Sequence, residues 1–247
     1  TAEMYAVPDY VYVITLPEPD ESRIVNRDAE VPINIGIIGA DSTELNALIF
    51  DFQRMYTRLF IPEDNRYLGR HAMFRRTDSL EELAEVRYKH VQNEYFKNYV
   101  KYFVGSLNAS LSRGEKFLIH HYITGKPVKY DHYEYIKFFT ACFRGHLQAM
   151  SARHPGQSLF NIINTLGDYG ALTAFLKKEP LMSSDTLREL ITLLNLWEFY
   201  FSADFAPEGV QQVVSQLLVS TRNEEHKKIA RNMLAYMGKL QPGSQAP

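Results

Sequence analysis

The stretch from Asp78 to Asn108 constrains the fold most, because its apolar side chains recur at intervals of three or four residues. This spacing places them on one face of an α-helix. Asp78 and Ser79 are favourable N-cap residues, and each is followed three positions later by a glutamate, which is the spacing of a capping box. The sequence therefore predicts one long amphipathic helix over 78–108, against which the other elements pack.

The polar face of this predicted helix carries a row of cations. Lys89, Lys97 and Lys101, together with Asn93, follow one another at multiples of four residues. Like charges at that spacing repel one another mildly. The row is typical either of a solvated helix surface with glutamates nearby or of a ridge that contacts an anionic partner, and the sequence leaves both interpretations open.

Proline, glycine and capping patterns divide the rest of the chain into further helices. Pro62 ends a predicted helix over 42–60, and Gly125 and Pro155 mark two more helix ends. The other predicted helices cover 112–124, 131–153, 158–166, 169–178, 185–202, 207–220 and 224–237. Such a run of short helices predicts a mainly α fold.

The first forty residues show no helical pattern. Tyr10, Tyr12 and Ile14 alternate with valines, and the apolar run 31–40 contains two glycines. Both runs are typical of short strands. Two strands alone are marginally stable in water, so we expect them to lie on the helical body or on a neighbouring subunit.

Charge is distributed unevenly, although the formal net charge is only −2. Residues 1–52 contain ten acidic and two basic side chains, whereas residues 53–153 contain 17 basic and ten acidic ones. Ten of the 16 tyrosines also lie in this middle segment. Cations neutralise phosphates and exposed rings stack on bases, so the segment is typical of a nucleic-acid-binding surface. The same tyrosines can instead be half-buried core residues with solvated hydroxyl groups.

Arginines are densest between residues 61 and 77, outside any strong helical pattern. Loops carry binding residues more often than helix faces do. We therefore predict a phosphate-binding loop, extended by cations of the long helix and by two tyrosines that stack on bases, although an ordinary charged surface loop has the same composition. The predicted nucleic-acid-binding residues are Arg66, Arg70, Arg75, Arg76, Lys97, Lys101, Tyr67 and Tyr95.

Motifs for other functions are weak. Cys142 is the only cysteine, which excludes an internal disulfide and fits a reducing, cytoplasmic compartment. We find no run long enough to span a membrane and no signal-peptide pattern. Gly36 and Gly39 match neither the dinucleotide-binding nor the P-loop pattern, and G-x-S-x-G is absent. The sequence therefore predicts a non-enzymatic cytoplasmic protein without a cofactor, a metal or a membrane contact.

One cluster of histidines and carboxylates keeps an enzymatic alternative open. His120, His121, Asp131, His132 and Glu134 lie within fifteen residues of one another. Adjacent histidines point about 100° apart on a helix, so these side chains bind a metal only if the fold brings them together. The other interpretation is that the carboxylates cap a helix and the histidines lie on its surface.

The predicted fold is a mainly α, multi-helix bundle of two lobes, with an extended N-terminal arm that carries two short strands. The arm covers 1–41 and is acidic, a basic and tyrosine-rich helical lobe covers 42–155, and a second helical lobe covers 156–240. A flexible polar tail over 241–247 completes the chain.

The predicted function is that of a self-assembling protein of the coat or nucleocapsid type. It binds single-stranded nucleic acid, with RNA as the expected ligand, and forms homo-oligomers through its N-terminal arm. The alternative is an α-helical adaptor or scaffold subunit that binds other proteins. The two differ in where the acidic arm lies, because an arm on the basic face of its own chain leaves no cation excess for nucleic acid.

Overall fold

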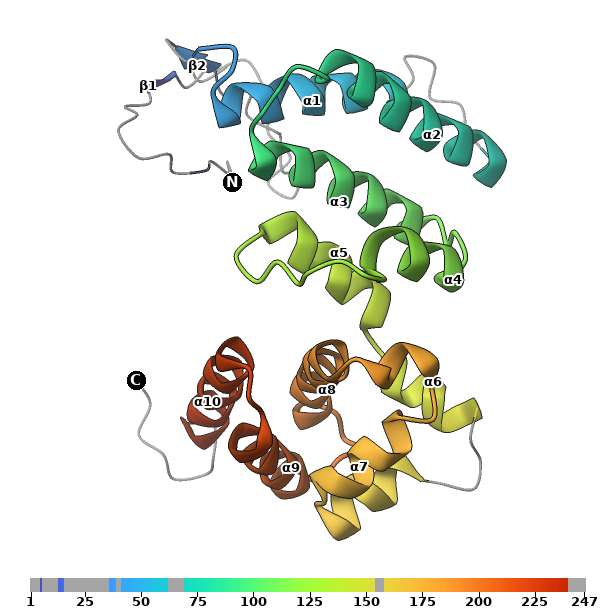
Figure 1. Ribbon diagram of the computed structural model, residues 1–247, viewed down its shortest axis with the longest axis vertical. Coiled ribbons are helices and arrows are strands. Elements are labelled where there is room, and N and C mark those ends of the chain that lie inside the picture. The colour runs from blue at the N-terminus through green and yellow to red at the C-terminus, as the bar shows by residue number, and fades with distance from the viewer. Residues whose placement is uncertain are drawn as a thin grey trace, which may run out of the picture. The chain divides into compact units, whose positions relative to one another are not determined.

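The structure, a computed structural model, describes residues 5, 13–15, 36–38, 41–61, 69–153 and 158–239 (Figure 1). Over these residues the chain is mainly helical, as predicted. It divides into two compact units, Thr1–Arg113 and Gly114–Pro247.

The described part of the first unit contains three helices, α1 (Leu45–Phe60), α2 (Arg70–Arg87) and α3 (Glu94–Ser110). Glu44 caps α1, because its carboxylate accepts hydrogen bonds from the backbone N–H groups of Asn46 and Ala47. The helix predicted over 42–60 is therefore confirmed, with its first residues forming a turn instead.

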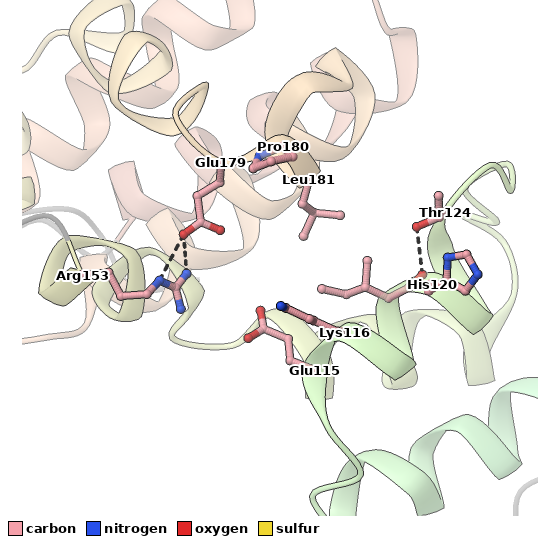
Figure 2. A pocket seen from close by; sticks show the side chains of 9 residues that line it. Glu115, Lys116, His120, Thr124, Arg153, Glu179, Pro180 and Leu181 are labelled. Carbon is pink, nitrogen blue, oxygen red and sulfur yellow. Dashed lines mark hydrogen bonds and ion pairs between the residues drawn. The ribbon is translucent and has the colours of Figure 1, made fainter.

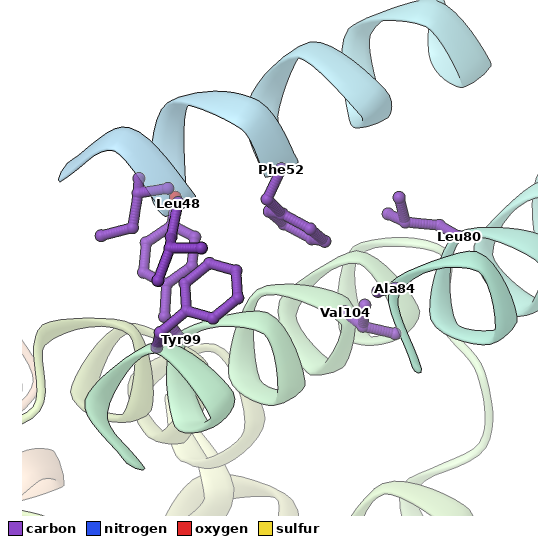
Figure 3. Close-up of a cluster of buried hydrophobic side chains, with 8 residues drawn as sticks. Leu48, Phe52, Leu80, Ala84, Tyr99 and Val104 are labelled. Atoms are coloured by element: carbon purple, nitrogen blue, oxygen red, sulfur yellow. The ribbon is translucent and has the colours of Figure 1, made fainter. Parts of the chain in front are cut away.

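A shared hydrophobic core joins these three helices. Figure 3 shows Phe52 pointing from α1 toward α3, with Leu80 and Ala84 on α2. The Phe52 ring is fully buried, and its centroid lies 6.0 Å from that of Tyr99 and 5.3 Å from that of Phe103, both on α3. Burying a side chain of this size contributes about 1.5–3 kcal/mol to the stability of the unit.

The prediction of one long helix over 78–108 is wrong. Two helices cover this stretch, because α2 ends at Arg87 and α3 begins at Glu94. The side chain of Asn93 starts α3 by accepting a hydrogen bond from the N–H of Phe96 at 3.0 Å. Both helices bury their apolar stripes against the same core, so the three-to-four spacing continues although the backbone turns.

Helices α2 and α3 run in opposite directions. The ring of Tyr88, just after α2, packs edge-on against Phe96 in the first turn of α3, with 4.8 Å between centroids. At the other end of the pair, Arg113 after α3 forms an ion pair with Asp78 of α2. The first half of α2 therefore lies beside the end of α3.

The second unit is built from a longer series of helices. Over its described residues these are α4 (Glu115–Leu118), the π-helix η1 (Ile119–Ile123), α5 (Tyr133–Phe143), α6 (His146–Arg153), the π-helix η2 (Asn161–Leu166), α7 (Tyr169–Leu176), the 3₁₀ helix η3 (Pro180–Ser183), α8 (Asp185–Tyr200), α9 (Pro207–Ser220) and α10 (Glu224–Lys239). The four α-helices predicted between 169 and 237 are confirmed to within three residues at each end. The helix predicted over 131–153 is divided, because Gly145 takes a left-handed conformation with φ of 68° after α5.

Residues on both sides of position 155 share one core, so the compact units differ from the predicted lobes. Asn195 of α8 is buried, and its amide nitrogen donates to the carbonyl oxygen of Phe143 at 3.0 Å. Its amide oxygen accepts from the N–H of Leu147 on α6 at 3.3 Å. A proline–glycine pair ends a helix but does not separate two cores, and the division between units instead follows Arg113.

Only part of the predicted N-terminal arm lies within the described residues. β1 (Val13–Thr15) pairs antiparallel with β2 (Gly36–Ile38), with Val13 opposite Ile38. Tyr5 contacts α1 of its own chain through Asn46. The rest of the arm and the tail predicted over 241–247 lie outside the described residues.

Candidate nucleic-acid interface

The predicted phosphate-binding arginines of the first unit do not share one surface. Arg70, Arg75 and Arg76 belong to α2, so the prediction of a loop is wrong from residue 70 onward. At 100° per residue, Arg75 and Arg76 point about 100° apart, and Arg70 points about 140° from Arg75. Arg76 turns toward α1, where its Nη1 donates to the carbonyl oxygen of Leu59 at 2.6 Å. Arg70 and Arg75 are exposed.

The two predicted lysines lie on a different helix and have contacts of their own. Lys97 is exposed and forms an ion pair with Glu94 at 2.9 Å, one turn earlier on α3. The Nζ of Lys101 lies 5.4 Å from the ring centroid of Tyr102. Both lysines occupy the first half of α3, which lies at the opposite end of the α2–α3 pair from Arg70 and Arg75. The structure therefore does not bring these cations together.

The predicted stacking tyrosines have equally little in common. Tyr95 is half-buried, and its ring packs edge-on against Tyr5 with 5.4 Å between centroids. In the structure it therefore contacts Tyr5 of the same chain. Tyr67 and Arg66 lie outside the described residues.

Helix α1 carries a basic and aromatic stripe that the sequence analysis missed. Phe50, Arg54 and Arg58 recur every four residues, on the side of α1 that faces away from the buried Leu48 and Phe52. Phe50 is 48% exposed. The guanidinium carbon of Arg54 lies 5.9 Å from the centroid of its ring, which is a cation–π contact.

The net charge of this stripe is positive. Asp51 is the only acidic residue of α1. It is paired with Arg87 of α2, whose Nε and Nη2 donate to the carboxylate at 2.6 and 2.8 Å. This interaction lowers the pKa of Asp51 and neutralises its charge. Among the described residues, Arg54 and Arg58 are exposed and have no salt bridge of their own on α1, although Arg54 contributes to the lowered pKa of Asp51.

Helix α2 extends the basic stripe on one side. The hydrogen bond between Arg76 and Leu59 places the end of α1 beside the first half of α2, where Arg75 is exposed. Within the described residues, Arg58 and Arg75 form no hydrogen bond or ion pair. We refer to Phe50, Arg54, Arg58 and Arg75 as the α1–α2 surface. The sequence signal for Phe50, Arg54 and Arg58 was their i, i+4, i+8 spacing on the polar side of the helix predicted over 42–60.

The second unit contains a pocket of about 450 Å³ (Figure 2). It is lined by Glu115, Lys116, Ile119, His120, Thr124, Arg153, Glu179, Pro180 and Leu181. Arg153 pairs with Glu179, with its Nη2 and Nε at 2.5 and 3.1 Å from the same carboxylate oxygen. Figure 2 shows Glu115 and Lys116 projecting from the start of α4. Two carboxylates and two cations balance one another, so this pocket has no electrostatic preference for an anion.

The histidines of the predicted alternative site do not converge. His120 is exposed beside the pocket, whereas the ring of His121 stacks on Phe117 with 5.4 Å between centroids. His132 is buried as the N-cap of α5. Among the residues that the structure describes, no three His, Cys, Asp or Glu side chains are grouped to hold a metal ion.

A buried hydrogen-bond network holds the second unit together around His226. The imidazole is fully buried, with Nδ1 2.7 Å from the Oε2 of Glu189 and Nε2 2.8 Å from the hydroxyl of Tyr130. Asn223 donates to the same hydroxyl at 3.0 Å. Burial raises the pKa of Tyr130, so the phenol keeps its proton. The network joins α8, α10 and the segment before α5. The sequence analysis did not predict this structural role, because the residues involved lie far apart in the sequence.

None of the helices in the described ranges is both long and apolar enough to cross a membrane. The α1–α2 surface is the candidate nucleic-acid interface, because it places exposed cations beside an exposed ring. Among known proteins, no family model, no curated protein and no solved structure matches this chain.

Proposed function

We propose that this chain binds single-stranded nucleic acid through the α1–α2 surface. The observation that carries the proposal is the contact between Phe50 and Arg54, in which a half-exposed ring lies 5.9 Å from a guanidinium group. An exposed aromatic face stacks on bases of any sequence, and a cation beside it neutralises the phosphate backbone. RNA is the expected ligand, as the sequence analysis predicts.

The charges around this contact support the same ligand. Arg58 follows Arg54 by one helical turn, roughly 6 Å along the axis, so both can contact the backbone of one strand. Arg75 adds a third exposed cation from α2. The proposed binding residues are therefore those of the α1–α2 surface, in place of the scattered set that the sequence predicted.

Self-assembly of the coat or nucleocapsid type is the second part of the proposal. The sequence assigns it to the N-terminal arm over 1–41, and Tyr5 of this arm has described contacts with helices of its own chain. These contacts involve α1 and α3. Asn46 lies one helical turn before Phe50 on the same side of α1, so Tyr5 is bound beside the Phe50 end of the α1–α2 surface.

One observation favours the alternative role of an adaptor that binds other proteins. Leu83 and Val86 of α2 are 47% and 71% exposed, and their spacing of three residues places them on neighbouring parts of one helix face. Exposed aliphatic side chains beside cations also suit a protein partner with an acidic, amphipathic helix. Binding to RNA distinguishes the two functions.

The experiment measures binding of a short, fluorescently labelled single-stranded RNA to the full chain across a salt series. The test variant is Arg54→Ala/Arg58→Ala. The control is Lys177→Ala/Lys178→Ala, which removes two exposed cations from the second unit. Each phosphate contact contributes about 0.7 to the slope of log affinity against log salt for a single strand. We expect the test variant to bind more weakly, with a slope shallower by about 1.4, and the control to match the wild type.

Two outcomes would count against the proposal. If the wild type binds no RNA even at low salt, the adaptor function takes its place. If both double variants lose affinity equally, binding follows overall charge and the α1–α2 surface is not the site. Circular dichroism of each variant establishes that the chain is folded, and the exposed positions of all four side chains make this the expected result.

A further inference from the structure

Tyr5 is held by α1 in the way that one strand holds another. Its backbone N–H donates to the Oδ1 of Asn46 at 2.8 Å, and its carbonyl oxygen accepts from the Nδ2 of Asn46 at 2.9 Å. One residue thus exchanges a donor and an acceptor with one side-chain amide, as two opposed residues do in an antiparallel ladder. These bonds recognise extended backbone at this position, whatever its side chain.

Buried polar groups fix the orientation of this amide. Asn46 and Glu44 are 6% and 5% exposed. The Nδ2 of Asn46 also donates to the Oε1 of Glu44 at 2.9 Å, and the Oε2 of Glu44 accepts from the backbone N–H of Asn46 at 2.9 Å. Because a carboxylate only accepts hydrogen bonds, it determines which end of the amide carries the hydrogens. The amide is therefore oriented before an extended segment binds.

Aromatic side chains of α3 select the residue type. The ring of Tyr5 packs edge-on against Tyr95 and Tyr99, with centroids 5.4 and 6.2 Å away. The hydroxyl of Tyr99 accepts a hydrogen bond from Gln53 of α1 at 3.0 Å, which holds its ring in place. Backbone pairing together with a pocket for one side chain is how domains recognise extended peptides. We call Glu44, Asn46, Tyr95 and Tyr99 the Tyr5 site.

We propose that the Tyr5 site is an exchangeable peptide-binding site, and that the segment around Tyr5 of a second copy of this chain occupies it in a homo-oligomer. The same hydrogen bonds and ring contacts form whether Tyr5 comes from the same chain or from another. Domain swapping of this kind exchanges identical contacts. The free energy of association therefore depends mainly on the entropy of loop closure and on any new contacts between the two copies.

The length and charge of the segment allow the exchange. Seven residues separate Tyr5 from β1, and fully extended they reach about 23 Å, so the β1–β2 pairing can stay intact. Residues 1–10 contain two acidic side chains and no basic one, whereas residues 45–113 contain eleven basic and eight acidic ones. Opposite charge draws the segment of one copy toward the first unit of another.

The first experiment uses a labelled synthetic peptide of residues 1–10 and the full chain carrying Tyr5→Ala, whose own segment lacks the ring that packs against Tyr95 and Tyr99. We expect this variant to bind the peptide. The wild type should bind it roughly tenfold or more weakly, since its own Tyr5 competes at an effective concentration of order millimolar. A peptide with Tyr5→Phe should bind, and one with Tyr5→Ala should not. Absence of binding to the folded Tyr5→Ala chain would overturn the proposal.

The second experiment tests whether the partner is another copy. A Tyr5→Ala chain has an intact site but lacks the ring that fills it, and an Asn46→Leu chain of similar side-chain volume has Tyr5 but lacks the amide that binds its backbone. Each alone should sediment as a monomer at concentrations where their mixture forms a heterodimer. A mixture that stays monomeric at every concentration, although the peptide binds, would show that the contact is only intramolecular and overturn the proposed oligomer. Both readouts are independent of RNA binding.

Discussion

Arg76 of α2 donates a hydrogen bond from its Nη1 to the carbonyl oxygen of Leu59 at the end of α1, at 2.6 Å. This bond turns one of the two adjacent arginines toward the protein, while Arg75 remains exposed. Neighbouring residues with the same side chain therefore have different roles. Arg76 joins two helices, and Arg75 is available to a partner.

Replacing the two arginines separately distinguishes these roles. We expect Arg76→Ala to lower the free energy of unfolding by about 1–2 kcal/mol, because the substitution removes the charged group that donates a hydrogen bond to the Leu59 carbonyl. Arg75→Ala should stay within about 0.5 kcal/mol of the wild type and weaken RNA binding instead. Urea unfolding and RNA titration measure the two effects. Equal stability of the two variants would contradict the structural role of Arg76.

Phe50 allows base stacking to be separated from charge. Its ring is 48% exposed, so Phe50→Leu should leave folding intact. We expect RNA affinity to fall by about 1–3 kcal/mol, the range for losing one base–aromatic contact. The slope against salt should not change, because the substitution removes no cation. Leu83→Ala, at a similarly exposed site on α2, is the control, and equal losses in both variants would argue against stacking on Phe50.

His146 should make the stability of the second unit depend on pH. The residue is 5% exposed, and burial lowers the pKa of its imidazole below the ordinary 6.5, although Glu115 and Glu179 oppose this shift and Arg153 adds to it. The unfolded chain therefore takes up this proton at a higher pH than the folded one does. Stability from this residue is complete well above pH 6.5 and decreases as the pH falls through that value.

The variant His146→Leu tests this dependence. It replaces the titrating imidazole with an apolar side chain of similar size. The stability of the variant should therefore change less between about pH 7 and pH 5 than that of the wild type. Urea unfolding at several pH values gives the two curves. Parallel curves would show that the acid sensitivity comes from other groups.

Two helical glycines predict opposite effects of the same substitution. A Cβ added at Gly209 of α9 would lie 2.3 Å from the carbonyl oxygen of Ile163 on η2, so the backbones would have to move apart. We expect Gly209→Ala to cost about 1–3 kcal/mol or more. At Gly238 of α10 nothing lies within 4 Å of such an atom, and Gly238→Ala should stabilise the chain by about 0.5–1 kcal/mol. Thermal unfolding measures both, and a neutral Gly209→Ala would contradict the close packing of α9 on η2.

Local chemistry made the α-helices from residue 169 onward predictable. Pro207 at the first position of α9 and the stretch from Pro180 to Ser184 before α8 act on their own segments of backbone. Caps and prolines determine a helix end through contacts within about four residues, which a sequence displays directly. The predicted ends there agree with the structure to within three residues.

Contacts between distant residues decided the rest. The apolar spacing over 78–108 is the same for one helix or for two that share a core, and only packing against α1 selects the turn before Asn93. The pairing of Asp51 with Arg87, 36 residues away, decides which cations remain on the surface. The sequence by itself determined a chain of short helices with a basic middle segment. Tertiary structure decided which arginines face solvent, because hydrogen bonds across 17 or 36 residues are invisible to any local pattern.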